Sequence, residues 1–127
     1  MKFLIFILFI FCKLLLAMDI SELEWSKRLL IISAKSHDDK ILINSNKFLR
    51  ETKCQIEDRN IQIIIFEEFE NKEFITPEFI RDKYGIWLVG YDGFIKDYSN
   101  DESVLFRLFD LIDSMPMRQN EIKDDIC

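Results

Sequence analysis

Two short apolar segments rich in β-branched residues constrain the fold of this chain more than any other feature. They cover residues 29–34 and 61–66, and continuous apolar runs of this length are typical of central strands covered on both faces. Residues 38–54 lie between them, and Ser36, three residues before Asp39, resembles the start of a capping box. If this segment is helical, one face of the helix carries five of its residues: Ile41, Ser45, Phe48, Leu49 and Thr52. A strand, a helix and a second strand of these lengths predict a right-handed βαβ unit with parallel strands.

The second half of the chain also alternates between helix and strand signals. Thr76 and Pro77 have the residue types of an N-cap and a first helical position, so a short helix is expected to begin there. Two strands are expected on either side of a tight turn at residues 91–93, and Ser99 or Asn100 is expected to cap a last helix. The expected ranges are 86–90 and 94–98 for these strands and 104–112 for the helix. The order β-α-β-α-β-β-α predicts an α/β domain of thioredoxin-like topology with a four-stranded mixed sheet.

The N-terminal segment differs in composition from the rest of the chain. A lysine precedes a ten-residue apolar run at residues 3–12, which has the length of a signal-peptide core and is short for a membrane span. We therefore expect residues 1–17 to be a cleaved signal peptide and residues 18–127 to form one secreted or periplasmic thioredoxin-like domain. Lys13 interrupts the apolar stretch, which leaves two alternatives open. Residues 3–16 could remain as an uncleaved anchor, the only expected contact with a membrane, or they could form a buried helix.

The charge of the chain argues against one class of partner. The formal net charge is −6, and it becomes −8 when Lys2 and Lys13 leave with the signal peptide. An acidic domain without a basic stripe is a poor binder of nucleic acid. No cofactor or metal motif is present, because the single histidine lacks the ligand spacing of a metal site. The expected partner is a protein or small ligand that the composition does not identify.

Four stretches of the chain together resemble a known family. They are WSKRLL at residues 25–30, DRN at 58–60, LVGYDGFIK at 88–96 and IDSMPMRQNE at 112–121. The last is the most specific, because Asp-x-Met-Pro-Met-Arg is hard to meet by chance. The pattern resembles a mostly bacterial, secreted family called domain of unknown function 4174, and similar domains occur in vertebrate extracellular coiled-coil-domain and sushi-repeat proteins. The resemblance covers about residues 20–121 and implies a thioredoxin-like fold, with a peroxiredoxin-like activity proposed for some relatives.

Thiol chemistry in this fold needs a cysteine at the start of the first helix, where the helix N-terminus stabilises the thiolate. Ser36, His37 and Asp38 occupy that region here, and no Cys-x-x-Cys motif exists. These three residues are the only weak catalytic candidates, and an exposed helix start is the simpler interpretation of His37. The sequence therefore favours a binding or accessory module without a redox cysteine. The alternative is a peroxiredoxin-like or thiol–disulfide oxidoreductase that works by another route.

Cys54 is expected near the C-terminal end of the first helix, where the helix dipole should raise its pKa. It could be a structural thiol, a redox group or one half of a disulfide with Cys127. The topology permits the disulfide, because the last helix should end on the same side as Cys54 and the tail after it is long enough to return.

The C-terminal motif has two interpretations, a structural latch and an interaction or ligand site. Its candidate residues are Asp113, Met115, Pro116, Met117, Arg118 and Glu121. Pro116 is expected to end the last helix, and Arg118 is expected to pair with Asp113 or Glu121 or to bond the free carbonyls at the end of that helix. Trp25 and Trp87 are expected to pack in the core or at its edge, and the alternative is that they form a platform for a ligand.

Overall fold

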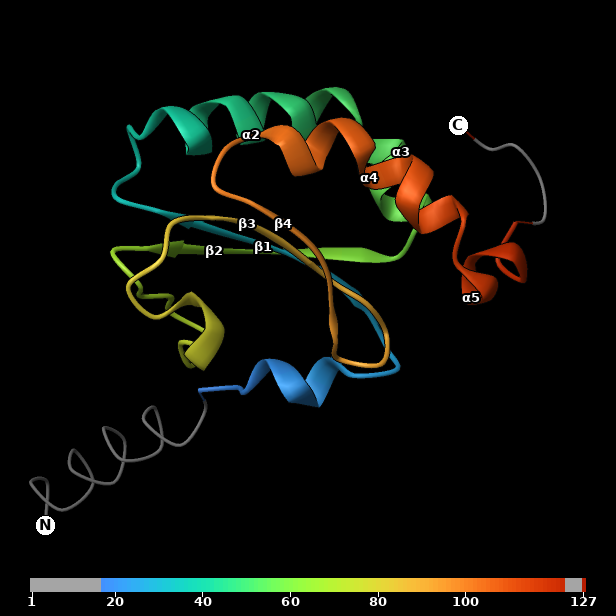
Figure 1. Ribbon diagram of the computed structural model, residues 1–127, viewed down its shortest axis with the longest axis horizontal. Coiled ribbons are helices and arrows are strands. Elements are labelled where there is room, and N and C mark those ends of the chain that lie inside the picture. Colours follow the sequence, from blue (N-terminus) through green and yellow to red (C-terminus); the bar gives the residue numbers. More distant parts are fainter. Residues whose placement is uncertain (1–16, 123–126) are drawn as a thin grey trace, which may run out of the picture.

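The computed structural model describes residues 17–122 and 127, which form a mixed α/β domain around one four-stranded sheet (Figure 1). The strands are β1 (Arg28–Ala34), β2 (Ile61–Glu67), β3 (Gly85–Val89) and β4 (Ile95–Ser99). They lie in the order β2-β1-β3-β4, with β1 parallel to β2 and antiparallel to β3, and with β3 antiparallel to β4. This mixed sheet confirms the predicted α/β class and is consistent with a thioredoxin-like fold.

Helices cover the two faces of the sheet unequally. The longer ones, α2 (Lys40–Glu51), α3 (Lys53–Asp58) and α4 (Ser103–Asp113), lie on one face (Figure 1). The short 3₁₀ helices η1 (Ile20–Leu23) and η2 (Glu78–Ile80) lie on the other. A further short helix, α5 (Pro116–Gln119), follows α4, the helix predicted as the last one. It lies beside the end of the sheet where β1 begins.

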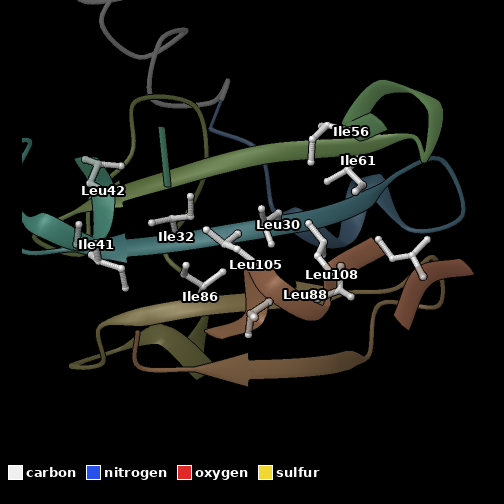
Figure 2. Close-up of a cluster of buried hydrophobic side chains, with 13 residues drawn as sticks. Leu30, Ile32, Ile41, Leu42, Ile56, Ile61, Ile86, Leu88, Leu105 and Leu108 are labelled. Carbon is white, nitrogen blue, oxygen red and sulfur yellow. The ribbon is translucent and has the colours of Figure 1, made fainter. Parts of the chain in front are cut away.

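Every residue of β1 is buried, as expected for a central strand. Its side chains alternate between two cores, because successive residues of a strand face opposite sides of the sheet. Leu30 and Ile32 join the core under α2 and α4, shown in Figure 2, whereas Leu29 and Ile31 join the core that contains Trp87. Arg28 is also buried, so the strand places a charged residue at the end of the helix-covered core.

Two helix starts differ from the sequence-based expectation. Asp39, not Ser36, is the N-cap of α2, and its carboxylate accepts a hydrogen bond from the Ile41 amide at 3.2 Å. A carboxylate immediately before the helix reaches the exposed amides better than a hydroxyl three residues further away. Glu102 precedes α4 without a side-chain cap, but the predicted capping residue Ser99 does accept a hydrogen bond from the Val104 amide at 3.1 Å.

The predicted second helix is reduced to the single turn η2. Pro77 stands at its N-cap position, and Thr76 does not cap it, because the Thr76 hydroxyl donates to the carbonyl of Phe69 instead. Asp82, with φ of 59°, takes the left-handed conformation two residues after η2 and prevents its extension. The chain then enters β3 at Gly85.

The predicted signal peptide lies outside the described residues except for Ala17. Within residues 17–122, no helix has both the length and the hydropathy needed to cross a membrane.

Candidate functional site

The four stretches that carry the family resemblance meet at the end of the sheet where β1 begins. Arg28 opens β1, Arg59 and Asn60 come directly before β2, and Tyr91 follows β3. Parallel strands begin at the same end of a sheet, and the antiparallel β3 finishes there. Three arginines and three carboxylates meet at this end and are called the arginine cluster: Arg28, Arg59, Arg118, Asp58, Asp113 and Glu121.

Arg118 holds the C-terminal segment against the body of the domain. Its side chain is 4% exposed and lies 2.6 Å from the Asp58 carboxylate and 3.1 Å from that of Asp113. A third carboxylate, Glu121, is 3.5 Å away, and the carbonyl of Asp58 accepts a further hydrogen bond at 2.9 Å. Both sequence-predicted pairings of Arg118 are therefore present, and Asp58 is an additional partner that the sequence did not indicate.

Arg59 lies between α3 and β2, and its side chain connects this part of the chain to α4. Its Nε and Nη2 donate to the two carboxylate oxygens of Asp113 at 3.0 and 2.8 Å, which is the bidentate geometry favoured by arginine and carboxylates. The guanidinium also lies 4.5 Å above the centre of the Phe109 ring. Asp113 is thus shared by Arg59 and Arg118.

Arg28 is the most buried member of the cluster, with 1% of its surface exposed. Its Nη1 donates to the Arg59 carbonyl at 2.7 Å and to Glu121 at 2.9 Å. The guanidinium lies 4.3 Å from the centre of the Tyr91 ring. Its Nε and Nη2 are buried without a hydrogen-bond partner in the part of the chain that the structure describes. An unpartnered donor pair on a buried charge costs stability, so it requires an explanation.

Tyr91 borders the arginine cluster and bonds to its member Glu121. Its hydroxyl donates to Glu121 at 2.7 Å and accepts from the Asn60 amide nitrogen at 3.0 Å. Burial, together with the bond to Glu121, raises the pKa of Tyr91. Burial acts to raise the pKa of Glu121, but the hydrogen bonds from Arg28 and Tyr91 outweigh it and lower that pKa. The hydrogen bond from Arg59, helped by Arg118, lowers the pKa of Asp113.

These shifts predict a loss of stability in acid. A carboxyl whose pKa is lowered in the folded state stabilises that state at pH values above its ordinary pKa, which is 3.8 for Asp113 and 4.5 for Glu121. This contribution is lost as the pH falls through the lower pKa of the folded state. We therefore expect the urea midpoint of unfolding to fall progressively below about pH 4.5. Asp97 beside Arg107 contributes in the same direction. Asp113→Asn should therefore flatten the profile only in part, and an unchanged profile would contradict the role given to Asp113.

A cavity of about 190 Å³ lies beside the arginine cluster. Arg28 and Tyr91 contribute to its wall, and the other lining residues are Trp25, Gly90, Asp92, Lys96, Met115, Pro116 and Met117. Lys96 and Asp92 pair with each other at 2.8 Å. The motif residues Met115, Pro116 and Met117 are thus brought to the cavity, although Met115 also packs against the helix-side core.

Trp25 contradicts the expectation that it packs in the core or at its edge. It is 65% exposed, whereas Trp87 is 3% exposed. Its φ of 65° is unusual for a bulky residue, and its amide donates to the Tyr91 carbonyl at 2.7 Å. Conformations of this kind persist only where the surrounding structure holds them, and they gather at binding and catalytic sites. The backbone therefore presents an indole ring at the rim of the cavity.

The weak catalytic candidates Ser36, His37 and Asp38 lie at the opposite end of β1. The Ser36 hydroxyl donates to the Asp38 carboxylate, and this bond lowers the Asp38 pKa. His37 and Asp38 are exposed. Over residues 17–122 and 127, no group of three or more histidine, cysteine, aspartate or glutamate side chains is arranged to hold a metal ion.

The two cysteines of the described chain are joined. Cys54 in α3 and Cys127 form a disulfide with Cα atoms 5.9 Å apart, within the range that such bonds require. The bond attaches the C-terminus to the helix that ends at Asp58, so it lies near the contacts of Arg118. That the exported protein carries this bond stays a prediction.

Three of the six members of the arginine cluster were not singled out from the sequence as candidate site residues, namely Arg28, Asp58 and Arg59. Their neighbours Asn60 and Tyr91 were not singled out either. One signal was available for Arg28, because a charged residue directly precedes an apolar run that reads as a fully buried strand. The others lie at the end of α3 or in turns, where charged and polar residues are ordinary, so no local pattern distinguishes them apart from the stretches that carry the family resemblance.

The comparisons with known proteins identify the family. No curated protein and no solved structure matches the chain. The family model described as domain of unknown function (DUF4174) matches residues 19–121, which include every member of the arginine cluster. The chain therefore belongs to the DUF4174 family.

Proposed function

We propose that the mature chain is an exported binding module that acts through the cavity beside the arginine cluster and performs no thiol chemistry. The observation that carries this proposal is the cavity itself, whose wall includes the buried Arg28 and the exposed Trp25. A concave, partly apolar site with a few convergent polar groups is the usual form of a ligand site.

A purely structural latch accounts for only part of this arrangement. It explains why Arg118 and Arg59 are fully paired with carboxylates. It does not explain why two donors of Arg28 have no partner among residues 17–122 and 127, or why Trp25 is held exposed in a strained conformation. Both features cost folding free energy. A ligand in the cavity would meet the exposed Trp25 ring, whereas Nε and Nη2 of Arg28 are enclosed by the protein.

The alternative, a peroxiredoxin-like or thiol–disulfide oxidoreductase, would have to use Cys54. We expect the mature protein neither to reduce insulin disulfides nor to consume peroxide above the rate of a Cys54→Ser variant. The reason is that the helix start carries Ser36, His37 and Asp38 where a low-pKa thiol would be needed. Both activities can be followed by standard turnover assays. Turnover that disappears in Cys54→Ser would establish the oxidoreductase and reject the proposal.

Export is part of the proposal. We expect the N-terminus of the mature protein to lie near Met18, because the preceding apolar run has the length of a signal-peptide core. N-terminal sequencing of protein from the extracellular or periplasmic fraction of the producing cells tests this. Recovery of intact Met1 in a membrane fraction would favour the anchor of residues 3–16.

A further inference from the structure

One edge of the sheet, the outer edge of β2, is left without a neighbouring strand. β2 is the first strand in the order β2-β1-β3-β4, so it pairs only with β1. The Asn60 carbonyl accepts a hydrogen bond from the Arg28 amide at 3.1 Å, and the Glu68 amide donates to the Ala34 carbonyl at 2.9 Å. Hydrogen-bonding groups of successive residues alternate between the two edges of a strand. The even-numbered residues of β2 therefore face β1, and the odd-numbered residues face outward.

Only the C-terminal end of this outer edge is covered. The Asn71 side chain donates to the Ile65 carbonyl at 2.7 Å, and the Glu67 amide donates to the Glu70 carbonyl at 3.0 Å. The outward amide and carbonyl of Ile63 and the outward amide of Ile65 have no hydrogen-bond partner among residues 17–122 and 127. A row of unpaired main-chain groups on an edge strand is a template for pairing with a further strand.

A broad hollow of about 890 Å³ lies along this free edge. It is lined on one side by residues 62–65 and Glu67 of β2, and on the other by residues 70–74. Four consecutive strand residues present their side chains to both faces of the sheet, and β1 occupies the other edge of β2. The hollow therefore lies at the outer edge and not over one face, which is the position that an added strand would take.

The two faces of the sheet offer different chemistry at the hollow. Ile63 and Ile65 are half-buried and pack against the helix-side core. Phe74 belongs to the core on the opposite face, and the exposed Glu70 and Glu73 that precede it also line the hollow. Alternate side chains of an added strand point to opposite faces. Such a strand places apolar side chains beside the two isoleucines and basic side chains beside the two glutamates.

We propose that the outer edge of β2 binds an extended segment of another protein in which apolar and basic residues alternate. Main-chain hydrogen bonds to Ile63 and Ile65 supply the pairing, and the acidic lining selects the basic side chains. The lining contains three glutamates and one lysine, so a second copy of this chain would bring like charges together at the edge. This surface shares no lining residue with the cavity beside the arginine cluster, so the inference extends beyond the proposed function.

Fluorescence anisotropy with the purified mature protein tests the proposal. The probe is a labelled peptide of alternating valine and lysine with seven residues, the length of β2. We expect it to bind roughly tenfold or more tightly than the same peptide with glutamate in place of lysine. Two further peptides carry N-methyl groups on all valines or on all lysines, which removes the main-chain donors from one edge or the other. One of the two should lose binding, and the other should retain it.

A pair of charge variants assigns the binding to the hollow. Glu73→Lys should weaken the lysine peptide about fivefold, the effect of one exposed ion pair, and leave the thermal midpoint unchanged, because this side chain is exposed. Asp110→Lys is the matched control, since it makes the same change of charge at another exposed position. It lies on α4, which packs against β3 and β4 on the far side of the sheet from the free edge of β2.

Several results would overturn the proposal. They are the absence of saturable binding, equal affinity for the lysine and glutamate peptides, and equal effects of the two charge variants. Loss of binding in both N-methylated peptides, or in neither, would show that main-chain pairing along one edge does not hold the peptide. A dimer in analytical ultracentrifugation that the lysine peptide dissociates would assign the edge to a second copy of the chain instead.

Discussion

Arg118→Ala is expected to destabilise the domain by about 3 kcal/mol, the lower end of the loss measured when one partner of a buried ion pair is removed. Arg118 is 4% exposed and contacts Asp58 and Asp113, so its removal leaves Asp58 without a cation partner among the described residues, whereas Asp113 keeps its bidentate contact with Arg59. The expected loss lies at the lower end because these carboxylates are 28% and 37% exposed, and water can solvate them in the variant. Urea unfolding at pH 7 measures the change.

Arg107→Ala is the matched control for this prediction. Arg107 also makes a bidentate contact with one carboxylate, that of Asp97, but its side chain is 49% exposed. An exposed pair contributes roughly 0–1 kcal/mol, so this variant should lose little. Equal losses for both variants would contradict the claim that Arg118 fixes the C-terminal segment through buried contacts. An unchanged Arg118→Ala variant that loses ligand binding would assign the residue to the site instead.

Removal of the Cys54–Cys127 disulfide has the other large expected effect. The bond joins residues 73 positions apart, and the chain-entropy model gives about 4 kcal/mol for a loop of that length. This value is an upper figure, because ordering the C-terminal tail opposes it. We expect Cys54→Ser and Cys127→Ser to lower the free energy of unfolding by the same amount, since each removes the same bond.

Two controls define this experiment. Wild type in a reducing buffer should unfold like either serine variant, because the same bond is then absent. Non-reducing mass spectrometry of the exported protein should show the mass of an intrachain disulfide. Two free thiols, or a dimer joined through Cys127, would reject the bond, and unequal losses in the two variants would show that Cys54 also contributes through local packing.

The regular elements of the sheet were predictable because their signals are local. The runs at residues 29–34 and 61–66 form β1 and β2, and the periodic segment 104–112 lies within α4. The turn before β4 was also predictable, because Gly93 takes a φ of 81°, a conformation that favours glycine. The helix expected after Thr76 failed because a tertiary contact with Phe69 replaced the local cap.

The candidate site was mostly not predictable, for a physical reason. Whether Arg28 is a buried group in the cavity wall or a solvated strand start depends on Arg59, Tyr91 and Glu121, which lie 31, 63 and 93 residues away. Only folding brings them together, and no spacing rule in the sequence encodes it. The C-terminal motif indicated Arg118 and two of its partners because these partners lie within five residues of it.

The central claim is that this domain binds ligand at the arginine cluster and not at the helix start. Amide chemical-shift mapping by NMR, with phenylacetate added to the ¹⁵N-labelled mature protein as a small aromatic probe, tests it most directly. The account predicts that the largest shifts fall in residues 25–28, 90–92 and 115–118, which line the cavity or adjoin it. Largest shifts in residues 35–40, around the Asp39 cap of α2, would place the site at the opposite end of β1 and contradict the account.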